Sequence, residues 1–579
     1  MYVRDSKRLI RLVLLAAVAG LMAGGAAYVL LNGIGLLTNL AWHGRLDWSL
    51  PSFAGLEPSW RNIVVPVVGA ALVTLLAKWS PIIRGHGIPE AMEAILRRGS
   101  RIQPRAAVAK PLSAAIAIGT GGPFGAEGPI IVTGGSIGSL IGQLFDVSAS
   151  ERKILLASGA AAGMAATFGA PLASVVIALE LLLFEFSTRA FIPLVVAVTL
   201  AAGVHSALFG HQSLFSVPAH EYAGIGKLPF YLVLGLACGL LATLVTKGLF
   251  LFEHLFRKLP VSVTWHPLIG AIGFGIIGVF VPRALGVGYD SISDVLAGTL
   301  PFGVLLLLFG GKLLAWWIAL ASGTSGGTLA PVLLTSGTFG GIFGILAERL
   351  FPGLGVTAGA AAVVAMAATF GAATRATFTS IVFLFELTGD YQIILPLMLA
   401  SAVADLVTFA LLPESLMTEK LARRGLRVTT DIRADVLEGT RVREIMTPQV
   451  ITLGADSTVG QARALFAETG HSAYPLVEAD GRCVGIVRRR HLGDVADDSL
   501  AIRQIARMEV VSATPEESAD RVLLRMVEED VDHLPVLDGS TLVGICTRTD
   551  LMRAKSRDQA VERREPGWIS GWISRRRTG

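Results

Sequence analysis

Two glycine-rich loops each lead into an apolar stretch of helical length, and both could hold a small anion. The loops occupy residues 119–125 and 323–327. A loop of this kind at a helix start leaves backbone N–H groups unpaired and adds the positive end of the helix dipole, and both features attract anions. Neither loop ends in the Gly-Lys-Ser/Thr of a phosphate-binding loop. Helix packing is the alternative function, but a third loop of this type at 84–90 favours an anion site.

Glu127 is the side chain in these loops most suited to do chemistry. It lies in Gly125-Ala126-Glu127-Gly128-Pro129, where we expect the first turn of a helix. An acidic residue there could simply compensate the helix dipole. An ionisable group within a membrane segment is costly, however, and is a functional candidate by default. A carboxylate at this position would occupy the place of an anion, so we expect its protonation or movement to open the path.

The composition indicates a membrane domain followed by a soluble one. The 579 residues are 53% hydrophobic, and their mean hydropathy is +0.63. About 11% of residues 1–426 are charged, against about 30% of residues 427–579. The net charge is only +5, and no basic stripe with interleaved aromatic residues occurs, which excludes nucleic acid as a partner. Three separated cysteines predict neither a disulfide framework nor a zinc site.

The N-terminal segment predicts an uncleaved first membrane span. Arg4, Lys7, Arg8 and Arg11 precede an apolar run from about Leu12 to Leu40. That run is longer than the ~7–15 residues of a signal-peptide core. Because basic residues favour the cytoplasmic side, we expect the N-terminus and the soluble part to be cytoplasmic. The chain would be a multi-pass integral protein of the inner or plasma membrane, with the lipid bilayer as its surroundings.

An internal repeat divides the membrane part into two halves. The heptapeptide Met-Ala-Ala-Thr-Phe-Gly-Ala occurs at 164–170 and again at 366–372. Each copy is followed by an apolar stretch that carries a glutamate, Glu180 or Glu386, and is preceded by one of the glycine-rich loops. Many apolar stretches are shorter than a full span, which is typical of broken helices that meet within the membrane. The repeat therefore predicts a working site between two related halves.

Four motifs in this order resemble the CLC chloride channels and transporters. They lie at 85–90, 125–129, 327–331 and 385–391. The resemblance implies a multi-pass α-helical membrane protein with two inverted repeats of broken helices. It also implies a homodimer with one pathway per subunit for chloride or a similar small inorganic anion, gated by Glu127. The anion-binding positions it implies are His86, Gly125, Ala126, Glu127, Thr328, Leu329 and Met417.

Several positions differ from the residues usual in this family. His86 replaces a serine, Leu329 a phenylalanine and Met417 a tyrosine, so two side-chain hydroxyl donors are missing. Leu181 occupies the place of the internal glutamate of proton-coupled members. We therefore expect a gated anion channel or transporter with little stoichiometric proton transport. The alternative within the family is a proton-coupled chloride antiporter, with His86 as a substitute titratable group.

The soluble part contains a second repeat, with a spacing of 60 residues. Residues 450–475 match 510–535, and each unit predicts the order βαββα. Such a pair resembles a tandem CBS module, which implies an adenine nucleotide (ATP, ADP or AMP) bound by Thr547 and Asp550. The first unit has Arg488 and His491 at the corresponding positions, so its own site is expected to be lost. A purely structural dimerisation module is the alternative.

These features predict five regions and exclude most other classes of protein. An intramembrane enzyme would need a nucleophile with its base or an H-E-x-x-H motif, and neither occurs, so we expect no enzymatic activity, required cofactor or bound metal. The alternative from a different class is a CBS-containing divalent-cation transporter, which should show several carboxylates facing its pore. The expected regions are a membrane domain at 1–426, a linker at 427–443, CBS units at 444–498 and 504–556, and a basic tail at 557–579.

Overall fold

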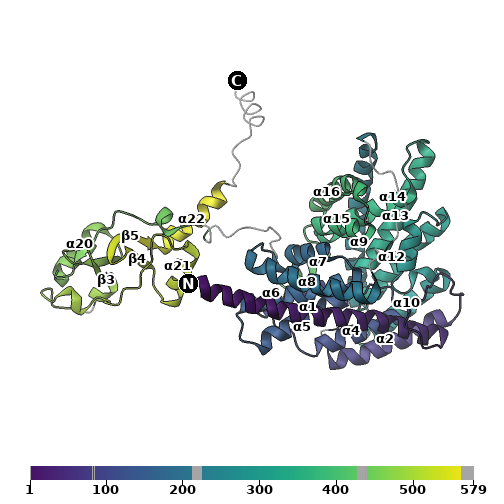
Figure 1. Cartoon of the computed structure of the whole chain (residues 1–579), viewed down its shortest axis with the longest axis horizontal. Coiled ribbons are helices and arrows are strands. Elements are labelled where there is room, and N and C mark those ends of the chain that lie inside the picture. The colour runs from purple at the N-terminus through teal and green to yellow at the C-terminus, as the bar shows by residue number, and fades with distance from the viewer. Residues whose placement is uncertain are drawn as a thin grey trace, which may run out of the picture. The chain divides into compact units, whose positions relative to one another are not determined.

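The chain divides into two compact units, Met1–Ile432 and Arg433–Gly579 (Figure 1). The computed structural model describes residues 2–80, 83, 85, 87–210, 215, 225–426, 437, 440–493 and 495–561. His86 and most of the expected linker and basic tail lie outside the described residues.

The regular elements described in the first unit are all helices. Its first half contains α1 (Tyr2–Thr38), η1 (Asn39–His43), α2 (Arg61–Trp79), α3 (Ile88–Arg97), α4 (Ala106–Gly119), α5 (Glu127–Leu144), α6 (Ala149–Phe168), α7 (Pro171–Ile177), η3 (Ala178–Leu183) and α8 (Thr188–Phe209). Its second half contains η4 (Ile225–Lys227), α9 (Leu228–Arg257), α10 (His266–Phe280), η5 (Pro282–Ala284), α11 (Tyr289–Leu296), α12 (Phe302–Ala321), α13 (Leu329–Leu350), α14 (Ala358–Thr374), α15 (Thr377–Thr388), η6 (Tyr391–Ile393), α16 (Ile394–Leu411) and α17 (Glu419–Arg423).

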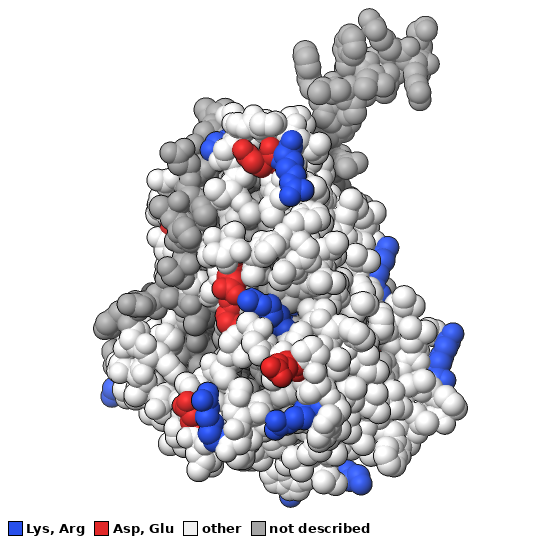
Figure 2. Space-filling model, turned by 90° about the vertical axis from the view of Figure 1, so that its right-hand side faces the viewer, with Lys and Arg blue, Asp and Glu red and all other residues white. Residues whose placement is uncertain are grey.

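Helices of membrane-spanning length alternate with shorter apolar ones, as the interrupted apolar pattern predicts. Seven described helices are long and apolar enough to cross a membrane, and the first of them covers Ser6–His43. Five others, such as Ala106–Gly119, are apolar but shorter. The face visible in Figure 2 carries only scattered charged side chains. A surface of this kind suits contact with hydrocarbon, where charged side chains are costly.

The two halves repeat the same order of elements around an approximate twofold axis. Helices α1 to α8 correspond in order to α9 to α16, and α1 runs beside α4, α5, α6 and α8 (Figure 1). Equivalent helices meet one another directly, namely α2 with α10, α5 with α13 and α7 with α15. Such self-matching contacts are what a twofold relation produces. The first heptapeptide copy covers the end of α6, and the second copy lies within α14, which is the equivalent helix of the second half.

Glu180 and Glu386 form the clearest reciprocal contact between the halves. Glu180 accepts hydrogen bonds from the backbone N–H of Thr379 (2.9 Å) and Phe378 (3.4 Å) at the start of α15. Glu386 accepts from the N–H groups of Leu172 and Ala173 (2.8 Å each) at the start of α7. Each carboxylate thereby satisfies helix-start donors that would otherwise lack partners inside an apolar unit. The glutamates that follow the repeated heptapeptide therefore join the two halves.

The second unit contains two small α/β subdomains. Its elements are α19 (Val442–Ile445), β1 (Leu453–Gly454), α20 (Val459–Thr469), β2 (Ala473–Val477), β3 (Cys483–Arg488), η7 (Arg489–Leu492), η8 (Ile502–Gln504), α21 (Ala519–Glu528), β4 (His533–Asp538), β5 (Thr541–Thr547) and α22 (Arg548–Val561). Strand β2 pairs in parallel with β1 and antiparallel with β3, while β4 pairs antiparallel with β5. Pro475 lies opposite Ile486 and Pro535 opposite Ile545, so the strand register repeats as well.

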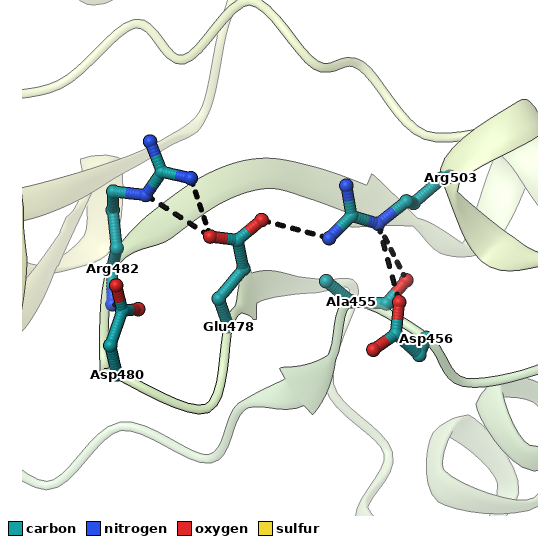
Figure 3. A network of polar contacts seen from close by, with 6 residues as sticks. All are labelled: Ala455, Asp456, Glu478, Asp480, Arg482 and Arg503. Carbon is teal, nitrogen blue, oxygen red and sulfur yellow. Dashed lines mark hydrogen bonds and ion pairs between the residues drawn. The ribbon is translucent and has the colours of Figure 1, made fainter.

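The leading segment of each subdomain packs into the other one. Val442 belongs to the core formed by α21, β4 and β5, and Thr447 forms a bridge with Ile545. Ile502 belongs to the core formed by α20, β2 and β3. Arg503 next to it donates to Glu478 Oε1 (2.9 Å), and Glu478 also accepts from Arg482 (Figure 3). These two flanking arginines lower the pKa of Glu478, so its carboxylate stays charged near neutral pH.

Three details of the expected βαββα units are wrong. The runs at 450–451 and 510–511 are not strands, since β1 is only Leu453–Gly454 and the second subdomain has a single parallel bridge, Ala513 with Val536, in that place. The first subdomain closes with the short 3-10 helix η7, whereas α22 closes the second. Residue propensity alone overestimates the length of the leading strands, because the length of a strand depends on the pairing that its neighbour offers. Strand β1 pairs with β2 at only two positions.

Candidate functional site

The glycine-rich loops of the two halves meet at the starts of α5 and α13. Gly125 and Gly327 form an antiparallel bridge, with N–H to O=C distances of 3.2 and 2.9 Å. Gly85, before α3, forms a second bridge with Ser325. A Cβ added at Gly87 would lie 2.3 Å from the carbonyl oxygen of Gly128, so only glycine permits this approach of α3 to α5. Three helix starts expected from the sequence are therefore held together by backbone contacts.

Glu127 lies where these loops meet, and it is almost completely buried. Its side chain is 2% exposed, and it is the first residue of α5. Oε1 lies 3.5 Å from the Tyr289 hydroxyl, while Oε2 has no hydrogen-bond partner among the described residues. A Cβ at Gly125 would approach Oε2 to 1.8 Å, and one at Gly327 to 2.6 Å. The carboxylate therefore rests directly on the two bridged glycines.

A narrow cavity adjoins the carboxylate, and three of the expected anion-site residues line it. Glu127, Thr328 and Leu329 line it, together with Ile88 at the start of α3. Its remaining walls are Gly128, Ile131, Met164, Ile177 and Phe370. Met164 and Phe370 come from the two copies of the repeated heptapeptide. The repeats thus contribute both the helix starts and part of the wall around one enclosed space.

The other expected residues have different surroundings. Gly125 and Ala126 lie immediately before α5, beneath the carboxylate, and Ala126 is fully buried. Met417 is also fully buried, in a turn where its backbone N–H donates to Ser415 Oγ (3.2 Å), but it does not line the cavity at Glu127. Leu181, in the place of the internal glutamate, is 1% exposed. His86 lies outside the described residues.

Sequence reasoning missed two buried lysines and Tyr289. Lys110 Nζ donates to the carbonyl oxygens of Ile83 (2.7 Å) and Gly85 (2.8 Å), in the loop before α3. At the equivalent place in the second half, Lys312 Nζ donates to Gly286 (2.7 Å) and Ala284 (3.1 Å), in the loop before α11. The only sequence signal was a single lysine in each of two apolar helices, α4 and α12.

The charges around the cavity suit a small anion. Lys110 and Lys312 are both fully buried, donate to carbonyl oxygens of the loops that converge here and form no ion pair with a carboxylate among the described residues. The N–H groups of the first turns of α5 and α13 have no carbonyl partner within their own helices, and they present the positive ends of two helix dipoles. Glu127 is the one carboxylate among the described residues that line the cavity.

The CBS-like unit has a separate candidate site for a nucleotide. A cavity there is bounded by residues of both subdomains: Thr447, Gln449, Val450, Ile451, Gly470, His471, Ser472, Ala473, Tyr474, Pro475, His533, Ile545, Thr547, Thr549, Asp550 and Arg553. Both expected contacts are among them. His533 is hydrogen-bonded to Ser472 (3.0 Å), and burial lowers its pKa, which favours the neutral ring.

Thr547 and Asp550 also form a helix cap. The Thr547 N–H and hydroxyl both donate to Asp550 Oδ2 (2.9 and 2.7 Å), and the Asp550 N–H donates back to Thr547 Oγ1 (3.2 Å). This reciprocal pattern is a capping box at the start of α22. It fixes both side chains in the cavity wall and engages only one of the two Asp550 carboxylate oxygens. Arg488 and His491 form the corresponding but longer contact (3.4 Å) in the first subdomain.

Comparison with known proteins identifies the family. The model of the voltage gated chloride channel family matches residues 68–408. The chain belongs to this family. The CBS domain model matches residues 442–495 and 502–557.

Related transporters align with most of this family member. The H(+)/Cl(-) exchange transporters ClcA of Vibrio vulnificus and Klebsiella pneumoniae are each 31% identical to it, covering 68% and 70% of this chain and 85% and 87% of their own length. The crystal structure of a slow cyanobacterial Cl-/H+ antiporter has a TM-score of 0.63 at 26% identity, covering 72% of this chain and 97% of that one. That of a eukaryotic CLC transporter covers 94% and 98% at 22% identity, with a TM-score of 0.60, and shows the shared fold.

The position of the carboxylate predicts the effect of Gly125→Ala. The new methyl group would occupy the place of Oε2, so the side chain of Glu127 must leave its seat. We expect chloride flux at neutral pH to rise roughly tenfold, which corresponds to a loss of about 1.4 kcal/mol of preference for the seated carboxylate. Flux from proteoliposomes measures this. The control is Gly303→Ala in α12, where a Cβ meets nothing within 4 Å, and equal flux in the two variants would contradict the prediction.

Proposed function

We propose that this protein carries chloride or a similar small anion across a membrane through a pathway gated by Glu127. The observation that carries the proposal is the buried carboxylate seated on the Gly125–Gly327 bridge, where the helix starts converge. Membership of the chloride channel family and the exchange activity named for its relatives support the same function.

The proposed gating follows from competition for one site. The unpaired N–H groups that attract an anion also attract the Glu127 carboxylate, so the seated carboxylate excludes the anion. Protonation removes the negative charge and weakens this attraction, after which the side chain can leave its seat. The anion then takes the place of the carboxylate and is held by the backbone N–H groups at the starts of α5 and α13.

Backbone donors carry most of the proposed anion recognition. Thr328 and Leu329 supply N–H groups at the start of α13, while Ala126 and Glu127 supply them at α5. The side chains of Leu329 and Met417 have no hydroxyl group to add, and the contribution of His86 stays a prediction. Buried Lys110 and Lys312 strengthen the attraction, since charges act over longer distances in an apolar interior.

Proton-coupled exchange is the second candidate function, and the relatives favour it. The transporters of Vibrio vulnificus and Klebsiella pneumoniae are named as exchangers of protons and chloride. Against it, Leu181 has no titratable group at the position where coupled members of the family carry a glutamate. We therefore retain little or no stoichiometric proton transport as the expectation for this chain.

The CBS module is proposed to bind an adenine nucleotide and to regulate transport. A carboxylate can accept hydrogen bonds from the two ribose hydroxyls, and a threonine hydroxyl can contact a phosphate oxygen, which are the proposed roles of Asp550 and Thr547. Residues 447–451 form one wall of the cavity and follow directly on the linker from the membrane domain. Binding that favours one position of this segment would shift the equilibrium of the linker.

The arrangement of the chain is proposed on the same basis. The regions are the membrane domain at 1–426, a linker at 427–443, CBS units at 444–498 and 504–556, and a basic tail at 557–579. The functional unit is a homodimer with one pathway per subunit, and the N-terminus and CBS module face the cytoplasm.

The first test of the gate is Glu127→Gln. The amide resembles the protonated acid in shape and lacks its charge, so flux in the variant should depend only weakly on pH. Chloride efflux from proteoliposomes over a range of pH measures this. A pH dependence equal to that of the wild type would contradict gating by Glu127.

Proton coupling can be decided in the same vesicles. We expect a chloride gradient to drive little or no uphill proton movement, because Leu181 cannot bind a proton. Simultaneous recording of chloride and pH gives the ratio of the two fluxes. A fixed ratio that persists against a proton gradient would establish the exchanger instead, and its loss in His86→Ser would then identify His86 as the titratable substitute.

Asp550→Ala tests the nucleotide site. Hydrogen bonds to a charged group contribute about 1.5–3 kcal/mol each, so the variant should bind the nucleotide at least about tenfold more weakly. Calorimetry with ATP, ADP and AMP on the full chain in detergent measures the affinity. His491→Ala is the matched control in the first subdomain and should bind normally. If no nucleotide binds at millimolar concentration, the module serves as a structural dimerisation element.

A further inference from the structure

Tyr289 provides the one side-chain hydroxyl within hydrogen-bond distance of Glu127 in the described part of the chain. The phenol oxygen and Glu127 Oε1 are 3.5 Å apart. The remaining groups near the carboxylate are backbone N–H groups of Glu127 and Ala330 and the ammonium of Lys312. Tyr289 is the first residue of α11, and it comes from the opposite half of the membrane unit to Glu127.

Lys312 fixes the loop that presents this tyrosine. Its ammonium group holds the carbonyls of Gly286 (2.7 Å) and Val287 (3.4 Å), directly before α11. Gly288 follows with φ +86°, and a Cβ there would lie 2.9 Å from Leu334 and 3.5 Å from Lys312 Nζ. The backbone before Tyr289 is therefore confined by a buried charge on one side and by packing on the other.

Aromatic contacts fix the ring itself. Phe168 and Phe215 each pack edge-on against the Tyr289 ring, both with centroids 6.2 Å away. These contacts involve the ring alone, so they do not depend on the hydroxyl group. A phenylalanine at this position would keep the packing and lose only the hydrogen bond to the gate.

The approximate twofold relation indicates that this contact is a departure from symmetry. Tyr289 begins α11, and its counterpart Ile88 begins α3, where it lines the cavity beside Glu127. One of these equivalent positions therefore offers an apolar wall and the other a hydroxyl donor, both directed to the same carboxylate. The polar member contacts Oε1, while Oε2 rests on the glycines.

We propose that Tyr289 is a positioning residue that latches the seated Glu127 carboxylate through its hydroxyl group. This inference rests on the proposed gating by Glu127 and names what sets the ease of opening. The bond is made to the charged, seated carboxylate, and it is lost when the side chain leaves. The latch therefore stabilises the closed state and contributes nothing to the open one.

The decisive variant is Tyr289→Phe, measured as chloride efflux from proteoliposomes. We expect flux at neutral pH to rise about twofold, because the closed state loses one long, weak hydrogen bond of 3.5 Å. The matched control is Tyr231→Phe in α9, whose hydroxyl is fully buried and has no hydrogen-bond partner among the described residues. That control should transport as the wild type does. Unchanged flux in Tyr289→Phe would overturn the latch.

A double-mutant cycle separates the latch from a general structural effect. In a Glu127→Ala background the hydroxyl has no carboxylate to hold, so adding Tyr289→Phe should leave the flux unchanged. An equal rise in both backgrounds would overturn the proposal. If Glu127→Ala alone transported like the wild type, gating by Glu127 would fail. If Glu127→Ala changed transport while Tyr289→Phe did not, the latch alone would fail.

The pH dependence of chloride flux distinguishes the loss of the Tyr289 hydroxyl from a change in packing. The titratable and charged side chains that act on Glu127 from the described elements around it are Tyr289 on α11 and Lys312 on α12, and Asp290 on α11 acts in turn on Lys312. Asp290 and Lys312 are retained in Tyr289→Phe, so a change in the profile reports on the lost hydroxyl. We expect the rise in flux on acidification to begin at higher pH in the variant. A profile that coincides with the wild type would overturn the proposal.

Discussion

Backbone groups at helix ends inside an apolar unit must find partners, and this constraint organises the membrane domain. Short helices that meet within the unit leave N–H groups unpaired at their starts. Glu386 and Glu180 satisfy those of α7 and α15, and Glu90 accepts from Gly87 (2.7 Å) before α3. The buried lysines satisfy carbonyls in two of the loops. At the starts of α5 and α13, the proposed partners of the backbone N–H groups are the Glu127 carboxylate and the anion that takes its place.

Internal duplication explains how one sequence makes such a site. Each half contributes a glycine-rich loop, a lysine that holds the preceding loop and a glutamate that caps a helix of the other half. Because the contacts are reciprocal, the halves cannot shift independently of each other. The two halves differ at the helix starts that meet in the candidate site. The first residue of α5 is Glu127 and that of α13 is Leu329, so only one of these two equivalent helix starts carries a carboxylate.

The second unit is also held together by reciprocal contacts, here between its two subdomains. Its two subdomains exchange their leading segments, so Val442 packs in one core and Ile502 in the other. The segment that follows the linker consequently forms part of the cavity wall near Thr547. A ligand in this cavity would contact the same stretch of chain that connects to the membrane domain. The capping box of α22 holds the side chains of Thr547 and Asp550 in the cavity wall.

The sequence alone determined the membrane and soluble parts, the duplicated halves and the place of Glu127 at a helix start, because hydropathy, repeats and a charged residue beside glycines are local properties of the chain. The roles of Glu180 and Glu386 could not be read in this way. Their partners are backbone N–H groups about 200 positions away, which carry no signature in the sequence. Tyr289 was missed for the same reason, since it contacts Glu127 in the other half. Lys312 was missed because its partners are backbone carbonyls of its own half, which also carry no signature in the sequence. Only the packing of one half on the other decided which of many isolated polar residues reaches Glu127.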